Sequence, residues 1–403
     1  MNLMFLGKKT FLKSNITISE GIMARLIYAD NAATTKLDID AFEAMTPFLL
    51  QEYGNPSQPY SLSNKVNCAL KEARACISDC INALPNEIYF TSGGTESDNW
   101  AIQGAVLANR ERKTIVTSEI EHHAVLKSCE YMKNFGCDVV YVPVNSLGVV
   151  ESKALSNVLA HDVNLVSIML VNNEIGARQD IKKLAKIAHD SGALFHTDAV
   201  QAVGHIKVDV KDLGVDLMSA SAHKFGGPKG IGFLYVKNGI NIHPFMKGGA
   251  QEFNFRAGTE NVPAIVGMAT ALHKSVLQRD SEYIHRMEKT IVHILKDNGL
   301  TEGIDFIING NEESRVPGIL SLSFAGKSGE MILHRMDLMG IMISTGAACD
   351  SVHTQISHVI RAIGVKENFA QGTIRISLGM NNTVNEAKQI GDALVKIIGK
   401  KGG

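Results

Sequence analysis

The sequence predicts an α/β protein in which helices cover both faces of a mostly parallel sheet, followed by a smaller α+β unit. Between residues 88 and 238, short apolar runs alternate with helical patterns, as they do where buried parallel strands are joined by crossover helices. From about residue 280 the pattern changes to strand-like runs interleaved with helical ones. The two patterns therefore predict two structural units.

The first unit is expected to hold seven strands, at residues 87–92, 113–118, 138–144, 164–173, 193–200, 216–224 and 230–238. Helices are expected between them, at residues 96–110, 124–136 and 180–192. The last of these helices has one apolar face and a glycine stop signal at Gly192. Its apolar face consists of Ile181, Leu184, Ile187 and Ala188.

The second unit is expected to hold strands at residues 318–326, 341–349 and 372–379, with helices at 328–340 and 383–400. In open α/β sheets, ligands bind beyond the carboxyl ends of the strands. The polar clusters of this sequence follow its predicted strands, so we expect the functional site at that edge.

The length of 403 residues predicts two domains, because a single core of ordinary size needs fewer residues. We expect a large domain over residues 34–280, and a small domain formed by residues 23–33 and 281–403. Residues 1–22 lack a long apolar core and a small-residue cleavage site, so they make a poor signal peptide. We expect Met23 to be the native start and residues 1–22 to be an extension outside the fold.

The composition argues against several functional classes. Forty basic and 41 acidic residues give a net charge of −1, so we expect no direct nucleic-acid partner and no membrane partner. Six cysteines scattered through a long chain indicate reduced thiols and a cytoplasmic protein. Cys76 and Cys80 are four residues apart, but no second pair or nearby histidines accompany them. We therefore expect no metal site.

Two of the polar clusters each have a functional and a plain structural interpretation. "SGGTES" (92–97) lies between a strand and a helix, where glycines and unpaired N–H groups can hold a phosphate. Such Gly-Gly turns also occur without ligands. In "HTDAVQAVG" (196–204), Asp198 follows an apolar strand, where a carboxylate needs a positive partner. It could equally cap the next helical segment.

Two further clusters place polar groups at strand ends. In "SASAHKFGGPKGIG" (219–232), Lys224 stands between a strand and a glycine turn, either as a surface charge or as a desolvated amine able to form a Schiff base. In "VNNEIGARQDI" (171–181), Asn172, Asn173 and Glu174 end a very apolar strand, either in a plain turn or lining a ligand site. A phosphate cradle, an acidic partner and an amine are together the three anchors of pyridoxal phosphate.

The cysteine in "STGAACDS" (344–351) has two interpretations as well. Most free cysteines are small buried hydrophobic residues, but Cys349 stands in a stretch of small residues that opens a loop. The stretch alone does not distinguish burial from nucleophilic chemistry.

Ten motifs together resemble the pyridoxal-phosphate-dependent cysteine desulfurases, a group of class-V aminotransferase-like enzymes of fold type I. In order, these motifs read "YADNAATT", "GNPS", "FTSGGTESDN", "EHHAVL", "VNNEIG", "FHTDAVQAVGH", "SASAHKFGGPKGIGFLY", "RAGTEN", "STGAAC" and "IRISLG". The resemblance runs from about Ile27 to the last predicted helix. It implies a large domain with a seven-stranded-type sheet that binds pyridoxal 5'-phosphate, and a small domain that carries a catalytic cysteine.

The resemblance implies roles for individual residues around the cofactor. Lys224 would form the Schiff base, Asp198 would pair with the pyridine nitrogen, and His122 would stack on the ring and move protons. Gln201 would contact the phenolic oxygen. The phosphate would be held by Gly94, Thr95, Ser221, His223 and, from the second subunit of a homodimer, Thr259.

The resemblance also implies how L-cysteine reacts. Asn31, Asn173 and Arg375 would bind the substrate, with Arg375 gripping its carboxylate as a bidentate fork. The thiolate of Cys349 would take the sulfur as a persulfide, releasing alanine, with His122 as the candidate that makes the thiolate. An acceptor protein, such as an iron–sulfur scaffold or a tRNA-thiolation enzyme, would then receive the sulfur.

Two stretches depart from the family pattern. The stretch after "GNPS" reads "QPYSLSNK", with Tyr60 near the place where the family often has a histidine. The loop after Cys349 reads "DSVHTQISHVI" rather than a serine-rich stretch with Leu-Glu-Pro, and Asp350 would raise the thiol pKa by charge repulsion. The spacing of 26 residues from Cys349 to Arg375 (375 − 349 = 26) still suits the longer-loop group.

Two other functions remain open at this level. A selenocysteine lyase or another β-eliminating enzyme could use the same fold, and a requirement for Cys349 would discriminate against it. A non-catalytic interaction subunit could keep the fold alone, but the presence of Lys224, Asp198 and His122 argues against that interpretation.

Overall fold

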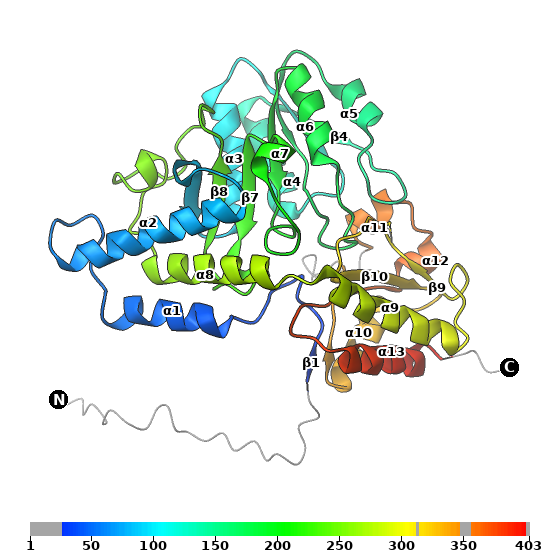
Figure 1. The fold of residues 1–403 in the computed structure, drawn as a ribbon. Coiled ribbons are helices and arrows are strands. Elements are labelled where there is room, and N and C mark those ends of the chain that lie inside the picture. Colours follow the sequence, from blue (N-terminus) through cyan, green and yellow to red (C-terminus); the bar gives the residue numbers. More distant parts are fainter. Residues whose placement is uncertain (1–25, 312–313, 347–355, 400–403) are drawn as a thin grey trace, which may run out of the picture.

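A computed structural model describes residues 26–311, 314–346 and 356–399 (Figure 1). Its largest sheet has seven strands in the spatial order β2-β8-β7-β6-β5-β3-β4. Only β8 runs antiparallel to its neighbours, so the predicted mostly parallel sheet is confirmed. In chain order the strands are β2 (Ile88–Thr91), β3 (Thr114–Ser118), β4 (Asp138–Val142), β5 (Val163–Ser167), β6 (Leu194–Asp198), β7 (Leu217–Ser221) and β8 (Gly232–Val236).

Helices cover both faces of this sheet because neighbouring residues of each strand point to opposite faces. In β5, Leu165 packs in the apolar cluster under α3 (Gly94–Ala108) and α4 (His123–Met132). Its neighbour Val166 packs in the cluster on the other face. The helices of that face are α2 (Leu62–Cys80), α5 (Ser152–Val158), α6 (Ile181–Asp190), α7 (Val210–Leu213) and α8 (Val262–Gln278), and α1 (Ile39–Leu50) packs outside α8.

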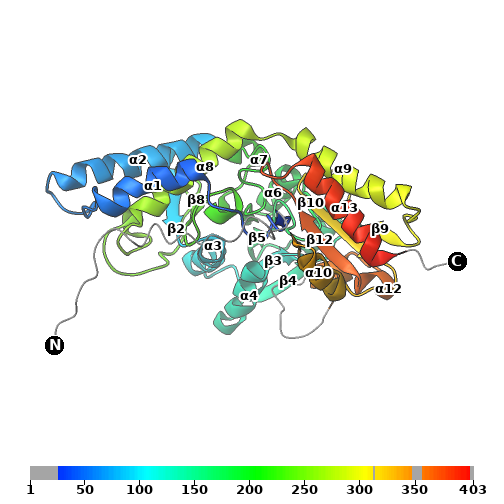
Figure 2. The same ribbon diagram turned by 90° about the horizontal axis from the view of Figure 1, so that it is seen from below.

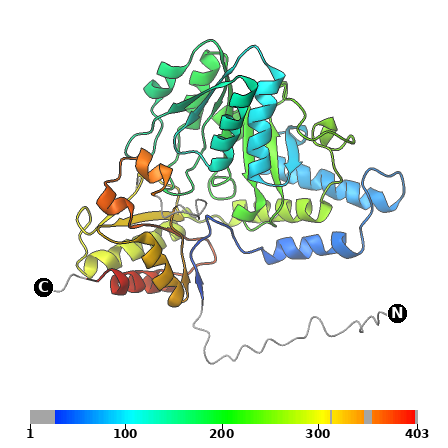
Figure 3. The same ribbon diagram turned by 180° about the vertical axis from the view of Figure 1, so that it is seen from behind.

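A second sheet of three antiparallel strands lies beside the first (Figures 1 and 3). It has its own apolar cluster, to which α9, α10 and α13 contribute. A short parallel pair, β1 with β11, adds the start of the chain to this region. The elements here are β1 (Ile27–Tyr28), α9 (Ser281–Asp297), β9 (Phe306–Ile308), β10 (Ile319–Phe324), α10 (Gly329–Leu338), β11 (Ile341–Met342), α11 (His358–Ala362), α12 (Glu367–Ala370), β12 (Thr373–Ser377) and α13 (Val384–Ile398).

Seen from below, the carboxyl ends of the parallel strands face the region between the two sheets (Figure 2). The segment that follows β1 contacts both sheets. The Asn31 N–H donates to the Ser377 carbonyl at 3.1 Å, and the Thr35 N–H donates to the His223 carbonyl at 2.8 Å. Residues 31–35 therefore cross the edge at which the site was predicted.

Most predicted strands are longer than the observed ones, most of all 341–349, of which only Ile341–Met342 form a strand among the described residues. Two others end early for a visible reason. The 164–173 strand ends at Ser167, because the Met169 N–H donates to the Glu121 carboxylate, at 2.9 and 3.1 Å, instead of extending the ladder to β3. The 216–224 strand ends at Ser221, and Ala222–Lys224 form a 3-10 turn in which the Phe225 N–H donates to the Ala222 carbonyl. Lys224 thus lies in a turn just beyond the sheet.

The described part of the chain has no helix both long and apolar enough to cross a membrane. Its five cysteines are all free thiols, at positions 68, 76, 80, 129 and 137. Residues 1–22, Cys349 and Asp350 lie outside the described residues.

Candidate active site

A tight turn between β2 and α3 forms the predicted phosphate cradle. Gly93 has φ +149°, a backbone conformation that favours glycine. A Cβ added to Gly94 would lie 2.7 Å from Val200 Cγ2, and one added to Gly93 would lie 3.5 Å from Ser221 Oγ. The turn therefore brings the start of α3 close to Ser221, and Thr95 is exposed in the first helical turn. Unpaired N–H groups at a helix start and a serine hydroxyl fit a phosphate.

The Lys224 amine is held by the segment that crosses the sheet edge. Its Nζ donates to the Ala32 carbonyl at 2.7 Å and to the Ala33 carbonyl at 2.9 Å. The Gln201 amide donates to the same Ala32 carbonyl at 2.8 Å. Next to the lysine, His223 Nδ1 lies 3.1 Å from Thr34 Oγ1. The structure thus brings three predicted cofactor ligands, Lys224, Gln201 and His223, against residues 32–34.

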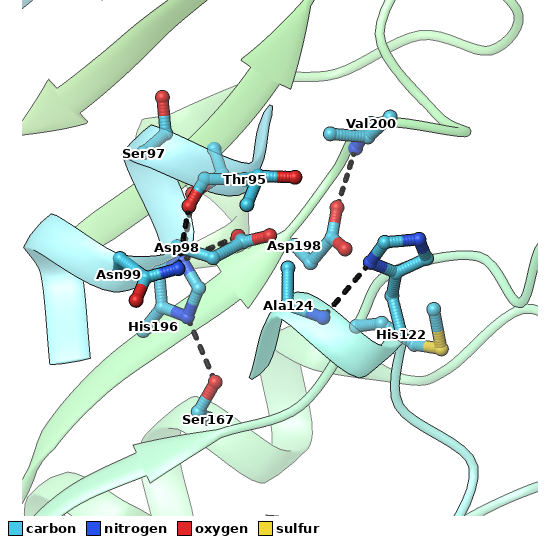
Figure 4. Close-up of polar contacts among 12 residues, drawn as sticks. Thr95, Ser97, Asp98, Asn99, His122, Ala124, Ser167, His196, Asp198 and Val200 are labelled. Carbon is cyan, nitrogen blue, oxygen red and sulfur yellow. Dashed lines mark hydrogen bonds and ion pairs between the residues drawn. The ribbon is translucent and has the colours of Figure 1, made fainter. Parts of the chain in front are cut away.

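Asp198 and His122 form the polar pair predicted to face the cofactor ring (Figure 4). Asp198 ends β6 and is 5% exposed, and its Oδ1 accepts the Val200 N–H at 2.9 Å. Burial raises the pKa of this carboxyl, and the nearby His122 and Lys224 oppose that rise. A cationic partner at Asp198, such as a protonated pyridine nitrogen, would relieve this desolvation.

His122 precedes α4 and caps it, since its Nδ1 accepts the Ala124 N–H at 3.1 Å. The proton of the neutral ring is therefore on Nε2. Burial lowers the pKa of this imidazole, which keeps the ring neutral at pH 7 and able to accept a proton.

A buried polar network lies behind Asp198 (Figure 4). His196 Nδ1 lies 2.8 Å from Ser167 Oγ, and its Nε2 lies 3.0 Å from Ser219 Oγ. Burial lowers the pKa of His196 to about 3, so its 3.7 Å approach to Asp98 is not an ion pair. Burial and the charge of Asp198 raise the pKa of Asp98. Among the described residues, Asp98 Oδ1 has no hydrogen-bond partner, which fits a protonated carboxyl.

Glu121 is a third buried carboxyl in this region. Its Oε1 accepts from Ser118 Oγ at 2.6 Å, in addition to the Met169 N–H. Burial raises the pKa of Glu121 to about 8. Of these three acids, Asp198 is the one beside the Lys224 amine, which opposes the rise of its pKa, so a negative charge is most favourable there.

Arg375 brings a guanidinium to the site from the three-stranded sheet. Its Nη1 donates to the Asn173 carbonyl at 2.9 Å, and its Nη2 donates to Asp30 Oδ1 at 2.8 Å. Its Nε is buried and has no hydrogen-bond partner among the described residues. An unpartnered donor on a buried guanidinium fits the binding of a carboxylate. Asn31 lies nearby, with its amide donating to Ser377 and Asn382.

One predicted site residue, Thr259, is described without a contact to this cluster. Thr259 is exposed. It lies on the same loop as Arg256, whose Nε forms an ion pair with Glu96 Oε1 at 2.8 Å. This position is consistent with a contact made to a second subunit and stays a prediction. Cys349 lies outside the described residues, between Gly346 and Ile356.

A group of polar residues was not singled out from the sequence. Asp98 and His196 come from α3 and β6, and only the folded sheet places them together. The one signal in the sequence was an acidic residue one turn into a helix whose remaining residues are mostly apolar. Glu174 was noticed only as one of three polar residues at a strand end.

Comparison with known proteins defines the class. Residues 27–390 match the class-V aminotransferase family, and the chain belongs to this family. Its members are pyridoxal-phosphate-dependent enzymes.

Closer relatives narrow this class to the cysteine desulfurases. The chain is 45% identical over 380 residues to the cysteine desulfurase IscS of Dictyoglomus turgidum, covering 94% of this chain and 96% of that protein. A solved NifS-like protein superposes with a TM-score of 0.84 at 37% identity, covering 93% of this chain and 98% of the other. A structure described as SspA in complex with cysteine gives a TM-score of 0.77 at 33% identity, covering 87% and 98%. The fold-type-I architecture and the desulfurase resemblance are confirmed.

Proposed function

We propose that this cysteine desulfurase converts L-cysteine to L-alanine, passes the sulfur to Cys349 as a persulfide, and hands it on to an acceptor protein. The observation that carries this proposal is the meeting of Lys224, Asp198 and His122 beside the Gly93–Gly94 turn, with Arg375 arriving from the second sheet. The 45% identity to a cysteine desulfurase supports it.

Pyridoxal 5'-phosphate, when bound, supplies an aldehyde that links to amines and a ring that accepts the electrons released at Cα. The residues present fit this group. Lys224 would hold the aldehyde and Asp198 the ring nitrogen. Gln201 would contact the phenolic oxygen. The phosphate would be held by Gly94, Thr95, Ser221 and His223.

The substrate carboxylate would bind at the edge of the three-stranded sheet. Arg375 has an unused Nε donor among the described residues, and a cysteine carboxylate could share the guanidinium with Asp30. Asn173, whose carbonyl accepts from Arg375, and Asn31, which bonds to Ser377 on the same strand, would complete the proposed carboxylate site. This site would orient the cysteine so that its side chain points toward the segment carrying Cys349.

Proton transfer would be divided between two bases. The Lys224 amine, once displaced by the substrate amine, removes the Cα proton and can return it. His122 is neutral with its proton on Nε2, so it would take the proton of a thiol on Nδ1, in exchange for the hydrogen bond from the Ala124 N–H. The thiolate is the reactive form of Cys349.

Sulfur transfer then balances as L-cysteine plus the Cys349 thiol giving L-alanine plus the Cys349 persulfide. The Cys349 sulfur attacks the substrate sulfur, so an S–S bond forms and the Cβ–S bond breaks. The electron pair of the broken bond stays with the carbon skeleton, and protonation at Cβ completes alanine. No external oxidant or reductant is consumed.

A homodimer is part of the proposal. Five large apolar side chains on or just after α1 are exposed, among them Leu50 at 66% and Tyr53 at 73%; the others are Ile39, Phe42 and Leu49. Several exposed large apolar side chains along one helix support a protein contact there. In such a dimer the exposed Thr259 of a second copy could add its hydroxyl to the phosphate site.

The acceptor is proposed to be an iron–sulfur scaffold or a tRNA-thiolation enzyme in the cytoplasm. The support is similarity to IscS and NifS proteins over most of the chain.

The test is an assay of the holoenzyme with L-cysteine and a reductant. We expect equal amounts of alanine and sulfide from the wild type, and loss of sulfide release in Cys349→Ser. Cys68→Ser is the matched control, because Cys68 is an exposed thiol on α2. Full sulfide release by Cys349→Ser would overturn the persulfide role and favour a β-eliminating or selenocysteine lyase.

A further inference from the structure

The two described ends of the segment that carries Cys349 meet at one oxygen atom. Ser357 Oγ donates to Glu174 Oε2 at 2.6 Å. A Cβ added to Gly346 would overlap the same Oε2. Ten residues lie between the two positions, and the eleven Cα-to-Cα steps from one to the other (357 − 346 = 11) would span about 38 Å if fully extended. The Glu174 carboxylate therefore closes the base of this segment.

Glu174 is itself firmly placed. Its N–H donates to Asn172 Oδ1 at 2.9 Å, and the Ile175 N–H donates to the same oxygen at 3.0 Å. The Asn172 amide donates in turn to the Ile120 carbonyl at 2.9 Å. Both Glu174 and Asn172 are buried. The turn that presents the carboxylate is thus fixed to the end of the seven-stranded sheet.

Each flank of the segment has further attachments. On the near side, the Ser344 N–H donates to the Arg375 carbonyl at 3.0 Å. On the far side, Ser357 caps α11 by accepting the Val359 N–H, and His358 Nε2 lies 3.0 Å from the Glu121 carbonyl. The near side is bonded to the strand of Arg375, and the far side contacts the loop before His122. Glu174 contacts both sides.

We propose that Glu174 is a positioning residue: its carboxylate accepts a hydrogen bond from Ser357 and packs against Gly346, and so sets where Cys349 meets the substrate sulfur. The inference rests on the proposed function of Cys349. Cys349 is three residues from Gly346 and eight from Ser357, and three extended residues reach at most about 11 Å. Gly346 is therefore the anchor that limits Cys349 most closely.

Glycine at position 346 follows from this contact. Any side chain there would overlap Oε2, so even the methyl group of an alanine could be accommodated only if the carboxylate or the chain moved. Gly346→Ala and Glu174→Ala should therefore be coupled: the added methyl group displaces the segment only while the carboxylate is present.

The test measures alkylation of Cys349 by iodoacetamide, followed on its own peptide by mass spectrometry, and single-turnover sulfur transfer to Cys349. We expect Glu174→Ala and Gly346→Ala to slow sulfur transfer by roughly 10-fold or more, since a 1 Å misplacement can cost about 100-fold. Both should change the alkylation rate, while the cofactor absorbance and its response to cysteine stay as in the wild type.

Glu174→Gln keeps an acceptor for Ser357 and should remain close to the wild type in both rates, whereas Ser357→Ala should fall between. Gly346→Ala should add little in a Glu174→Ala background. Glu87→Ala is the matched control, because Glu87 is a buried glutamate that accepts the Leu84 and Asn238 N–H groups away from this segment. It should leave Cys349 reactivity unchanged.

Wild-type rates in Glu174→Ala, or fully additive effects of the two alanine substitutions, would overturn the proposal. If Glu174→Ala does not fold, Ser357→Ala and Gly346→Ala carry the same test. Failure of the wild type to transfer sulfur would instead refute the proposed function, and the alkylation series would still report on Glu174.

Discussion

The two sheets present different kinds of polar groups to the active site. At the seven-stranded sheet, His122 and Asp198 each accept a backbone N–H, and Lys224 is held by two carbonyls. At the three-stranded sheet, Arg375 keeps a buried Nε without a partner among the described residues. We therefore propose that the first side holds a resident group, and that the second side keeps a donor for a ligand that comes and goes.

The two sides also differ in the side chains that lie behind the site. Behind Asp198 lie two more buried acids and a neutral histidine, whose pKa values are all shifted by burial. On both sides of Arg375 in β12, Ile374 and Ile376 belong to the apolar cluster of the small sheet. Substitutions on the first side should therefore alter protonation, and substitutions on the second side should alter substrate affinity.

The largest effect is expected at the seven-stranded sheet, on the side proposed to hold the cofactor. Lys224→Ala should lower the rate of alanine formation by at least about 1,000-fold, because it removes both the Schiff-base amine and a proton carrier. It should also abolish the absorbance of the covalently bound cofactor. Lys229→Ala, at an exposed lysine in the next turn, is the control and should retain activity. Persistence of a borohydride-reducible cofactor bond in Lys224→Ala would contradict the assignment.

The second largest effect is expected on the substrate side. Arg375→Lys keeps the charge but loses the planar fork, and kcat/KM for L-cysteine should fall roughly 100-fold. The cofactor spectrum without substrate should be unchanged. Arg361→Lys, at an exposed position on α11, should behave as the wild type. A kcat/KM near the wild-type value would show that Arg375 does not bind the carboxylate.

A third effect should appear in the pH dependence of stability. Glu121 keeps its proton in the folded state up to a pKa of about 8, against an ordinary value of 4.5, so the folded state binds more protons than the unfolded chain between these values. Stability should therefore fall as pH rises through this window, by up to about 1.4 kcal/mol per pH unit from this group.

Urea unfolding at pH 5 and pH 8 measures this effect. Glu121→Gln carries no titrating proton, so its stability should fall less over the same interval than that of the wild type. Parallel losses in the two proteins would show that Glu121 is not protonated in the folded state.

The smallest effect is expected at Asp98. Asparagine resembles a protonated aspartic acid, so Asp98→Asn should change the free energy of unfolding by less than about 1 kcal/mol, whereas Asp98→Ala should cost about 1–3 kcal/mol. Chemical denaturation of both variants at pH 7 measures the difference. Equal losses in the two variants would mean that Asp98 is ionised when folded.

Much of the fold was predictable because buried strands appear in the sequence as runs of apolar residues. The predicted strand ends were wrong where a side chain competes with the sheet, as at Met169, whose N–H is taken by Glu121. The division into residues 34–280 and the two small-domain segments, the compartment, and the extension over residues 1–22 stay predictions.

The positions of the candidate anchors were predictable from local motifs, since Gly94, Ser221, His223 and Lys224 each lie at or just after the end of a strand. Contacts between distant segments were not. Glu174 and Ser357 are 183 residues apart in the chain, and His196 meets Asp98 only because β6 lies under α3. Local spacing carries no information about such pairs.

The most direct test of the proposed sulfur transfer is a single turnover of the holoenzyme with one equivalent of L-cysteine, followed by peptide mass spectrometry. We expect one added sulfur atom on the peptide containing Cys349, together with one equivalent of alanine. Alanine or pyruvate formed without sulfur on Cys349 would refute the transfer to this residue.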